Sequence, residues 1–232
     1  MTPQQQALVS SEVFYPESDG KPIADNTKQF RWIVVIEQNL EWLFADNPNV
    51  FVAGDLLWYP IEGNNTVCTA PDAMVVFGRP KGDPCGICEA ARGSYQQWKE
   101  DNLPPQVVFE VLSPGNTRRE MDPKLLFYDR YGVEEYYIYD PDRIELSGWQ
   151  RSDTGLDSIE EMNGWISPRL GIRFNLAEEL ELYRPDGGRF LSFAEINQQL
   201  ANERQRAEQA EQQKAEVEQL LQQYRDRFGE LD

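Results

Sequence analysis

The sequence of 232 residues contains no histidine, three cysteines and far fewer basic than acidic side chains. Without histidine, the chain cannot form a Ser-His-Asp or Cys-His catalytic arrangement or bind a metal through imidazole. Acid–base or metal chemistry must therefore use carboxylates, lysine, tyrosine or cysteine. Since 22 Lys and Arg stand against 40 Asp and Glu, the formal net charge is −18. That charge excludes a generally basic protein that coats nucleic acid nonspecifically.

Long apolar runs are also missing. No window approaches the ~18 consecutive apolar residues of a transmembrane helix. Residues 1–10 are polar and rich in glutamine, without the apolar stretch of a signal peptide. We therefore expect a cytoplasmic protein with no membrane contact, in which the cysteines are thiols rather than disulfides.

The chain is long enough for one domain with a substantial core and an appendage. Its composition divides it into a polar N-terminal segment (residues 1–26), a domain (27–192) and a C-terminal helical region (193–232). Residues 201–232 hold eight acidic and five basic side chains, so the rest of the chain carries a net charge of −15. The acidic character therefore belongs mainly to the domain.

The first half of the domain predicts one helix and three strands. Apolar spacing indicates a helix over residues 27–45, before Asp46-Asn47-Pro48. Apolar runs at 50–58 and 73–77 predict a hairpin, and 106–112 predicts a third strand. Residues 78–105, rich in Gly, Pro and charge, indicate a long loop, and loops of this length are usually functional or disordered.

The second half predicts a well-punctuated helix followed by more strands. Asp122 suits the N-cap, Pro123 the first turn and Gly132 the C-terminal end, which predicts a helix over 123–131. Residues 133–139 predict a fourth strand, with weaker strand signals at 145–150 and 164–174. This mixture indicates an α/β or α+β domain.

Glu110 is the most informative residue, because it lies within an almost entirely apolar strand. Such a strand is typical of the covered interior of a sheet, where an unpaired carboxylate costs several kcal/mol. Glu110 therefore needs a cation, a lysine or a proton as a partner. The structural alternatives are an edge position or a buried ion pair.

Asp72 follows Pro71 where the second hairpin strand begins. If this strand lies beside the third, Asp72 and Glu110 meet at one end of the sheet. Two converging carboxylates make a hard oxygen site for Mg²⁺ or Mn²⁺, which can bind a phosphate oxygen and activate water. The alternative for Asp72 alone is an ordinary turn residue.

Lys124 lies in the first turn of the helix after Glu110, where a cation opposes the helix dipole. That placement favours a specific role, such as stabilising a phosphoryl transition state or orienting a nucleophilic water. The alternative is a surface lysine whose stem covers apolar residues.

Several blocks in this order resemble the Uma2-like family of restriction-endonuclease-like proteins, formerly a domain of unknown function and frequent in cyanobacteria. The blocks are APDAMVV (70–76), VFEVLSP (108–114), KLLFY (124–128), YGVEEYY (131–137) and YDP (139–141). Similarity covers about residues 27–141 and continues more weakly to about 193. The family belongs to the PD-(D/E)xK nucleases, which implies a mixed β-sheet flanked by helices and Mg²⁺-dependent phosphodiester hydrolysis.

The resemblance also implies roles for individual residues. Asp72 and Glu110 match the two acidic positions of the family motif. Its usual lysine position is occupied by Leu112, and the family resemblance implies that Lys124 supplies the ammonium instead. Candidate additional ligands are Asp55 and, at lower rank, Gln29 and Glu37 of the first helix.

Two further features of the domain leave alternatives open. Cys85 and Cys88 form a C-x-x-C pair that could join Cys68 in a zinc site or act as a redox pair, although a loop insertion with incidental thiols is favoured. Five basic residues could form a cationic rim for a nucleic-acid backbone, or could be scattered surface charge: Lys81, Arg92, Lys99, Arg118 and Arg119.

The tail carries a heptad pattern. Apolar or small residues recur at alternating spacings of 3 and 4 from Ala207 to Leu231, with Lys214 at one seam position. This pattern predicts either a solvated helix lying on the domain or a coiled-coil arm that makes a homodimer.

Two functional hypotheses follow. The first is a Mg²⁺- or Mn²⁺-dependent endonuclease in which Asp72, Glu110 and Asp55 bind the metal and Lys124 assists the attacking water. Its partner is nucleic acid, favoured as DNA and bound weakly because the domain is acidic. The second is a catalytically silent, nuclease-like binding or regulatory module that self-associates through its C-terminal helix.

Overall fold

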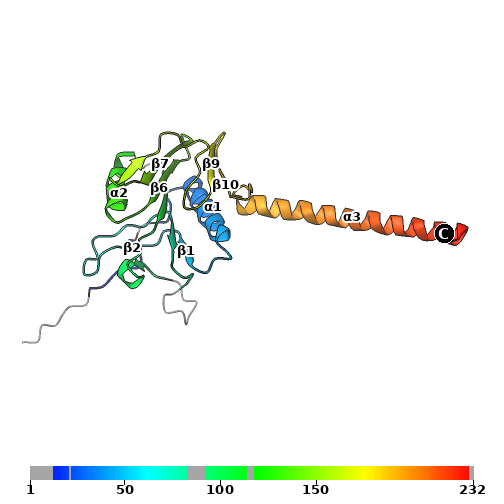
Figure 1. Ribbon diagram of the computed structural model, residues 1–232, viewed down its shortest axis with the longest axis horizontal. Helices are drawn as coiled ribbons and strands as arrows, with labels where there is room; N and C mark the ends of the chain where they lie inside the picture. Colours follow the sequence, from blue (N-terminus) through cyan, green and yellow to red (C-terminus); the bar gives the residue numbers. More distant parts are fainter. Residues whose placement is uncertain (1–12, 21, 83–91, 114–117, 230–232) are drawn as a thin grey trace, which may run out of the picture. The chain divides into compact units, whose positions relative to one another are not determined.

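The computed structural model describes residues 13–20, 22–82, 92–113 and 118–229 (Figure 1). The chain forms two compact units, Met1–Phe190 and Leu191–Asp232, each described by itself. The elements of the first unit are α1 (Thr27–Leu43), β1 (Val50–Ala53), β2 (Trp58–Tyr59), β3 (Ala73–Phe77), β4 (Tyr95–Gln96), the 3₁₀ helix η1 (Gln97–Lys99), β5 (Val107–Val111), α2 (Arg118–Arg130), β6 (Glu135–Asp140), β7 (Glu145–Arg151), β8 (Leu156–Ser158), β9 (Arg173–Leu176) and β10 (Leu180–Tyr183).

The centre of the first unit is a six-stranded mixed sheet in the order β1-β3-β5-β6-β7-β8. Neighbouring strands are antiparallel except β5 and β6, which are parallel and joined through α2. Two further pairs, β9–β10 and β2–β4, form separate two-stranded sheets. The α/β class and the mixed sheet expected from the sequence are confirmed.

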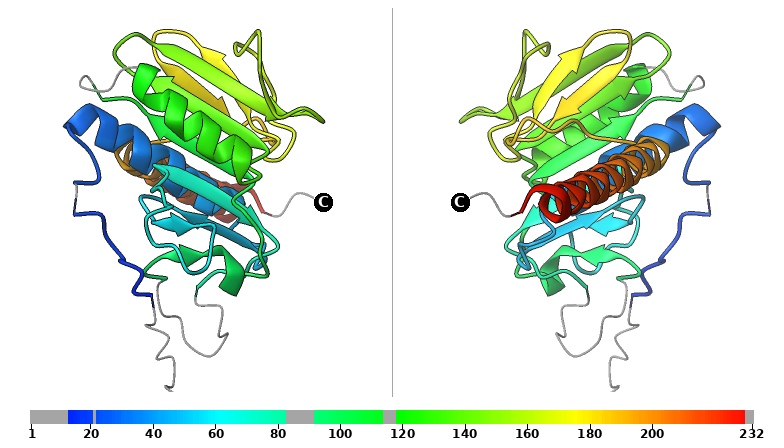
Figure 2. Two further views of the ribbon diagram at one scale, coloured as in Figure 1. Left: turned by 90° about the vertical axis from the view of Figure 1, so that its left-hand side faces the viewer. Right: turned by 90° about the vertical axis from the view of Figure 1, so that its right-hand side faces the viewer.

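Side-chain alternation along the strands gives the sheet two buried faces. One face packs α1 and the β9–β10 hairpin against residues such as Val75, Phe109 and Tyr137. The other packs α2, β2 and β4 against residues such as Met74 and Val108. The left view of Figure 2 shows α2 on the sheet, and the right view shows the β9–β10 hairpin. With both faces covered, β5 is apolar along nearly its whole length.

The predicted hairpin is confirmed, but its first strand is shorter than expected. β1 ends at Ala53, and Asp55 adopts a left-handed backbone with φ of 50°. At Gly54 a β-carbon would come within 3.2 Å of the Asp72 carbonyl oxygen and 3.3 Å of Glu37 Cγ. The chain therefore turns where two backbones approach closely, and Trp58 and Tyr59 pair with β4 instead. The region expected to be a long loop thus includes β4 and η1.

The helix after β5 begins earlier than its capping pattern predicts. α2 starts at Arg118, so the expected N-cap at Asp122 is wrong and Pro123 lies inside the helix. Pro123 is the sixth residue of α2, so it lacks the N–H that would bond the carbonyl four residues earlier, and its ring crowds that carbonyl. The weak strand expected over 164–174 is displaced to β9, while the strand at 145–150 is confirmed as β7.

The described part of the N-terminal segment packs on the first unit. The Tyr15 ring lies 5.1 Å from Tyr59 and 4.9 Å from Trp98, measured between centroids. The Tyr59 hydroxyl donates a hydrogen bond of 2.8 Å to the carbonyl oxygen of Pro16. Residues 13–26 thereby contribute to the surroundings of the cavity described below.

The second unit consists chiefly of α3 (Phe193–Phe228), a helix of 36 residues. Ser192 and Glu195 form a reciprocal capping box at its start, and Gly229 caps its end with φ of 79°. Within the described ranges, none of the helices is both long and apolar enough to cross a membrane.

Candidate active site

The registers of three neighbouring strands bring three carboxylates together. Ala53 pairs with Met74, and Ala73 pairs with Phe109. Continuing these registers past the paired residues places Asp72 opposite Glu110 on one side and Asp55 on the other. The Asp55 N–H donates to the Pro71 carbonyl oxygen at 3.0 Å, which keeps the two chains adjacent beyond β1.

Glu110 lies in the interior of the sheet, not at an edge, and only 3% of the residue is exposed. It shares the α2 face with Val108 and Leu112. Lys124 Nζ lies 2.7 Å from Glu110 Oε2, and the Tyr128 hydroxyl donates to Oε1 at 2.5 Å. Both partners come from one face of α2, since they are separated by four residues. The buried carboxylate therefore has the cationic partner that its position requires.

Asp72 lies across from this pair at the end of β3. Its Oδ2 accepts a hydrogen bond of 2.6 Å from the Val111 N–H, which fixes the carboxylate against the end of β5. That is the one hydrogen bond to Asp72 within the described part of the chain, and the side chain lines a cavity of about 730 Å³.

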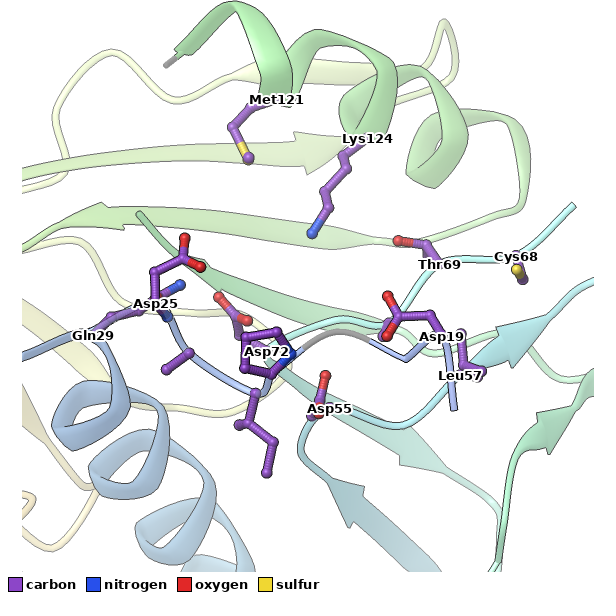
Figure 3. A pocket seen from close by; sticks show the side chains of 14 residues that line it. Asp19, Asp25, Gln29, Asp55, Leu57, Cys68, Thr69, Asp72, Met121 and Lys124 are labelled. Atoms are coloured by element: carbon purple, nitrogen blue, oxygen red, sulfur yellow. The ribbon is translucent and has the colours of Figure 1, made fainter. Parts of the chain in front are cut away.

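Side chains from several elements line the cavity, and Figure 3 shows them in a close view. Lys124 extends into it from α2, opposite Asp72 and Asp55. The N-terminal segment contributes Asp19 and Asp25. The cavity is therefore acidic, and among the described lining residues Lys124 supplies the cationic group.

Gln29 fixes the start of α1 to the end of β5. Its Nε2 donates to the Val111 carbonyl oxygen at 2.8 Å, and its Oε1 accepts from the Asp25 N–H at 2.9 Å. The Ser113 hydroxyl in turn donates to Asp25 Oδ2 at 2.7 Å. Gln29 is thus a positioning residue, which holds the backbone beside Glu110 together with the N-terminal segment.

The electrostatics of the cavity follow from its excess of carboxylates. Burial and the neighbouring charge of Glu110 raise the pKa of Asp72 well above its usual range. Partial burial and the charge of Asp19 raise the pKa of Asp55. Burial alone lowers the pKa of Lys124, but the negative charges of Glu110 and Asp72 outweigh it, so the net pKa is raised. Lys124 is therefore an ammonium that donates hydrogen bonds, not a general base.

The side chains present fit a hard divalent cation. Three carboxylates against one ammonium leave an excess of negative charge, and all the donors are oxygens. In the described ranges, no three Cys, Asp or Glu side chains form a metal-ligating group by themselves. Mg²⁺ commonly takes one or two carboxylates and completes its shell with water and substrate phosphate, so the donor set suits it.

The other candidate residues occupy different places. Glu37 Cγ approaches Gly54, and its Oε2 accepts a hydrogen bond from Gln38 at 2.6 Å. Neither Glu37 nor Glu110 is among the residues that line the cavity, but Glu110 contacts Lys124, which does line it.

The structure describes the side chains of three of the five residues expected in a cationic rim, Lys81, Arg92 and Lys99, so the rim stays a prediction. The Arg92 side chain is 3% exposed, pairs with Glu100 at 2.7 Å and covers the Phe51 ring at 4.0 Å, so these contacts give no support to Arg92 as a rim residue. Lys81 pairs with Glu41 at 2.9 Å, and Lys99 is exposed. The side chains of Arg118 and Arg119 lie outside the described residues.

Of the three cysteines, Cys68 is the one that the structure describes. Cys68 lines the cavity as a free thiol whose pKa is raised by burial. Cys85 and Cys88 lie outside the described residues, so the zinc and redox alternatives stay predictions.

Sequence reasoning missed Tyr128 and Asp25. Tyr128 carries a usable signal, because it follows Lys124 by one helical turn and therefore shares its face. Asp25 precedes the first helix by two residues and offers only the general preference of aspartate for helix starts.

Comparisons relate the chain to known proteins. A crystal structure of a "putative nuclease belonging to DUF820" from Anabaena variabilis matches with a TM-score of 0.47 and 15% identity, covering 64% of this chain and 74% of that one. No curated protein matches the sequence. The model of the Uma2 family, described as "Putative restriction endonuclease", matches residues 18–182. The chain belongs to the Uma2 family.

Proposed function

We propose that the protein is a metal-dependent nuclease that hydrolyses phosphodiester bonds, with DNA as the favoured substrate. The observation that carries this proposal is the contact of 2.7 Å between buried Glu110 and Lys124, a lysine that lines one cavity together with Asp72. Buried acid–lysine pairs that face a cavity are typical of catalytic sites, since burial and opposite charges tune both groups. The family description supports the same reaction class.

Asp72 and Glu110 would hold Mg²⁺ or Mn²⁺, with Asp55 as a further ligand. When bound, the metal supplies a Lewis acid for a phosphate oxygen and a lower pKa for water. Lys124, as an ammonium, orients the attacking water by donating a hydrogen bond and stabilises negative charge on the phosphorane-like transition state. Tyr128 fixes the second oxygen of Glu110, so the carboxylate keeps its orientation during turnover.

The acidic domain restricts how nucleic acid binds. Long DNA attracts proteins mainly through phosphate contacts with Lys and Arg, and the net charge of −18 opposes that attraction. We therefore expect weak, salt-sensitive binding limited to the surroundings of the cavity, where a bound cation would reverse the local sign.

Cleavage of supercoiled and branched DNA with Mg²⁺ or Mn²⁺ tests the proposal. Wild type is expected to nick or linearise at least one of these substrates, while Asp72→Asn and Glu110→Gln lose the activity. The Lys28→Met variant is a matched control, because Lys28 pairs with Asp142 and does not line the cavity. Cleavage by Glu110→Gln at the wild-type rate would contradict the assignment.

A silent binding module is the second candidate, and one observation favours it. Both Glu110 oxygens already accept hydrogen bonds, from Lys124 and Tyr128, so a metal would have to share or displace these donors. Calorimetric titration with Mn²⁺ separates the candidates. Binding by wild type that disappears in Asp72→Asn supports the nuclease, whereas no binding at all supports the module.

A further inference from the structure

A stripe of large apolar side chains is exposed along α3, which is unusual for a solitary helix. Phe193 is 80% exposed, Leu200 47%, Val217 62% and Leu221 47%. A helix of 36 residues that buries none of these side chains gains little from packing. The stripe therefore indicates a partner surface along α3.

The stripe follows a heptad seam along the helix. The alternating spacing of 3 and 4 residues predicted for the tail continues back along the helix to Phe193. Large apolar side chains occupy both ends of this seam and Ala207 and Ala210 occupy its middle. Two charged residues interrupt it: Glu203 on one side of the alanines and Lys214 on the other.

The two seam charges decide how a second copy would pair. In a parallel pair, each seam residue faces the same residue of the second copy, so Glu203 lies against Glu203 and Lys214 against Lys214. Two like-charged contacts in the seam would oppose association. In an antiparallel pair centred between Ala207 and Ala210, Glu203 instead faces Lys214 of the second copy, and the symmetry makes this contact twice.

That same register matches every other described seam position. Ala207 faces Ala210 of the second copy, so the two backbones can approach closely at the centre. Leu200 then faces Val217, and Ile196 faces Leu221. Outside the seam, the register also brings Arg204 near Glu211 of the second copy.

Antiparallel registers shifted from this one lose the pairing between Glu203 and Lys214. Because the pattern repeats every seven residues, permitted shifts are multiples of seven. One shift places Glu203 against Leu221 of the second copy, and the opposite shift places it against Ala207. Both leave a carboxylate against an apolar side chain, without its cation.

We propose that α3 pairs with α3 of a second copy as an antiparallel coiled coil, fixed in register by two reciprocal Glu203–Lys214 ion pairs. Within the described ranges of the single chain, the ion pair that Lys214 makes is an exposed contact of 3.9 Å with Glu218, one turn along the helix. Such exposed pairs contribute little, so the ammonium is available to a second copy. The pairing does not depend on the proposed hydrolase activity.

A charge-swap cycle on the full-length chain tests both the partner and its direction. Sedimentation equilibrium is measured for wild type, Glu203→Lys, Lys214→Glu and the double swap. The Glu216→Lys variant is the matched control, since it makes the same charge change outside the seam. Circular dichroism of each variant checks that α3 keeps its helicity.

We expect a wild-type dimer whose Kd rises at least ~10-fold in each single swap, because both ion pairs become repulsive. The double swap restores dimerisation to within ~3-fold of wild type, since the opposite charges face each other again. A parallel pair predicts otherwise: all four proteins would associate alike, because like charges face each other in each. That result overturns the proposal, as does a monomeric wild type, a higher oligomer, or a control as disruptive as Glu203→Lys.

Discussion

Two buried carboxylates on adjacent, parallel strands have opposite surroundings. Glu110 of β5 is 3% exposed and Glu135 of β6 is 1% exposed. Glu110 faces α2, where a lysine from the cavity wall contacts it. Glu135 faces the other side of the sheet, where Tyr137 donates to it at 2.9 Å, the Arg169 N–H at 2.7 Å and the Ser167 hydroxyl as well.

The difference separates a carboxylate suited to chemistry from one that holds the fold together. The donors to Glu135 are two hydroxyls and one backbone N–H, all from the protein itself. They connect β6 to the chain segment before β9, so Glu135 acts as a structural cross-link. Glu110 instead has a charged donor that also reaches a cavity large enough for solvent and substrate. Burial alone therefore does not mark a carboxylate as a candidate for catalysis. The groups that surround the carboxylate make this distinction.

The largest expected effect is the loss of cleavage when Glu110 is replaced. Glu110→Gln should reduce cleavage by ~10³-fold or more, because the amide cannot ligate a metal as an anion. Glu135→Gln, on the next strand, should cleave at close to the wild-type rate. The measurement is the initial rate of supercoiled DNA nicking. Equal losses in both variants would remove the distinction between the two carboxylates.

Lys124 should show the next largest effect. Lys124→Met keeps the length of the side chain but removes the ammonium, and we expect cleavage to fall by ~10²-fold. The loss should appear in kcat more than in KM if the ammonium acts on the transition state. A change in KM alone would assign Lys124 to substrate binding instead.

Replacing Glu135 should lower the free energy of unfolding more than replacing Glu110 does, whereas replacing Glu110 should lower cleavage more. Glu135→Ala leaves the hydroxyls of Tyr137 and Ser167 and the Arg169 N–H without their acceptor, which should cost ~3 kcal/mol in the free energy of unfolding. Urea denaturation followed by circular dichroism measures this loss. A smaller loss than in Glu110→Ala would reverse the roles assigned to the two residues.

The smallest expected effect is a pH dependence of stability. Burial raises the pKa of Glu135 above its ordinary value of 4.5, although hydrogen bonds from Ser167 and the Arg169 N–H oppose the shift. The folded state therefore holds this proton more tightly than the unfolded chain does. Its stabilising contribution is complete below pH 4.5 and is lost as the pH rises through the raised folded-state pKa.

Glu135→Gln has no such proton. Its unfolding free energy should fall less than that of wild type as the pH rises from about 4 through the region above the ordinary glutamate pKa. Parallel pH series of urea denaturation provide the measurement. Identical pH profiles for the two proteins would show that Glu135 is not perturbed.

The meeting of Asp72 and Glu110 could be predicted because it depends on strand adjacency alone. An apolar strand that begins at Ala73 and another that contains Glu110 must place the two acids together once they pair antiparallel. The cationic partner was also predictable in kind, since a buried carboxylate requires one. The family resemblance then supplied the identity of Lys124.

Other features depended on contacts between distant residues and could not be read locally. Arg92 appears as one more base in a polar segment, yet Glu100 and Phe51 enclose it. Glu135 follows another glutamate after a turn, a pattern typical of a solvated strand start. β1 ends next to Gly54, where a β-carbon would come within 3.2 Å of the Asp72 carbonyl oxygen, and the sequence of β1 alone does not reveal this approach.

Because Asp55, Asp72 and Glu110 come from neighbouring strands, the proposed nuclease activity would also depend on correct strand pairing. Since each residue comes from a different strand, a slip of one position in either ladder would turn one carboxylate to the opposite face of the sheet. Such a misfolded chain would keep its helices and strands, and its circular dichroism would look native. Only a catalytic assay, or metal binding at the cavity, would distinguish it from the correctly registered protein.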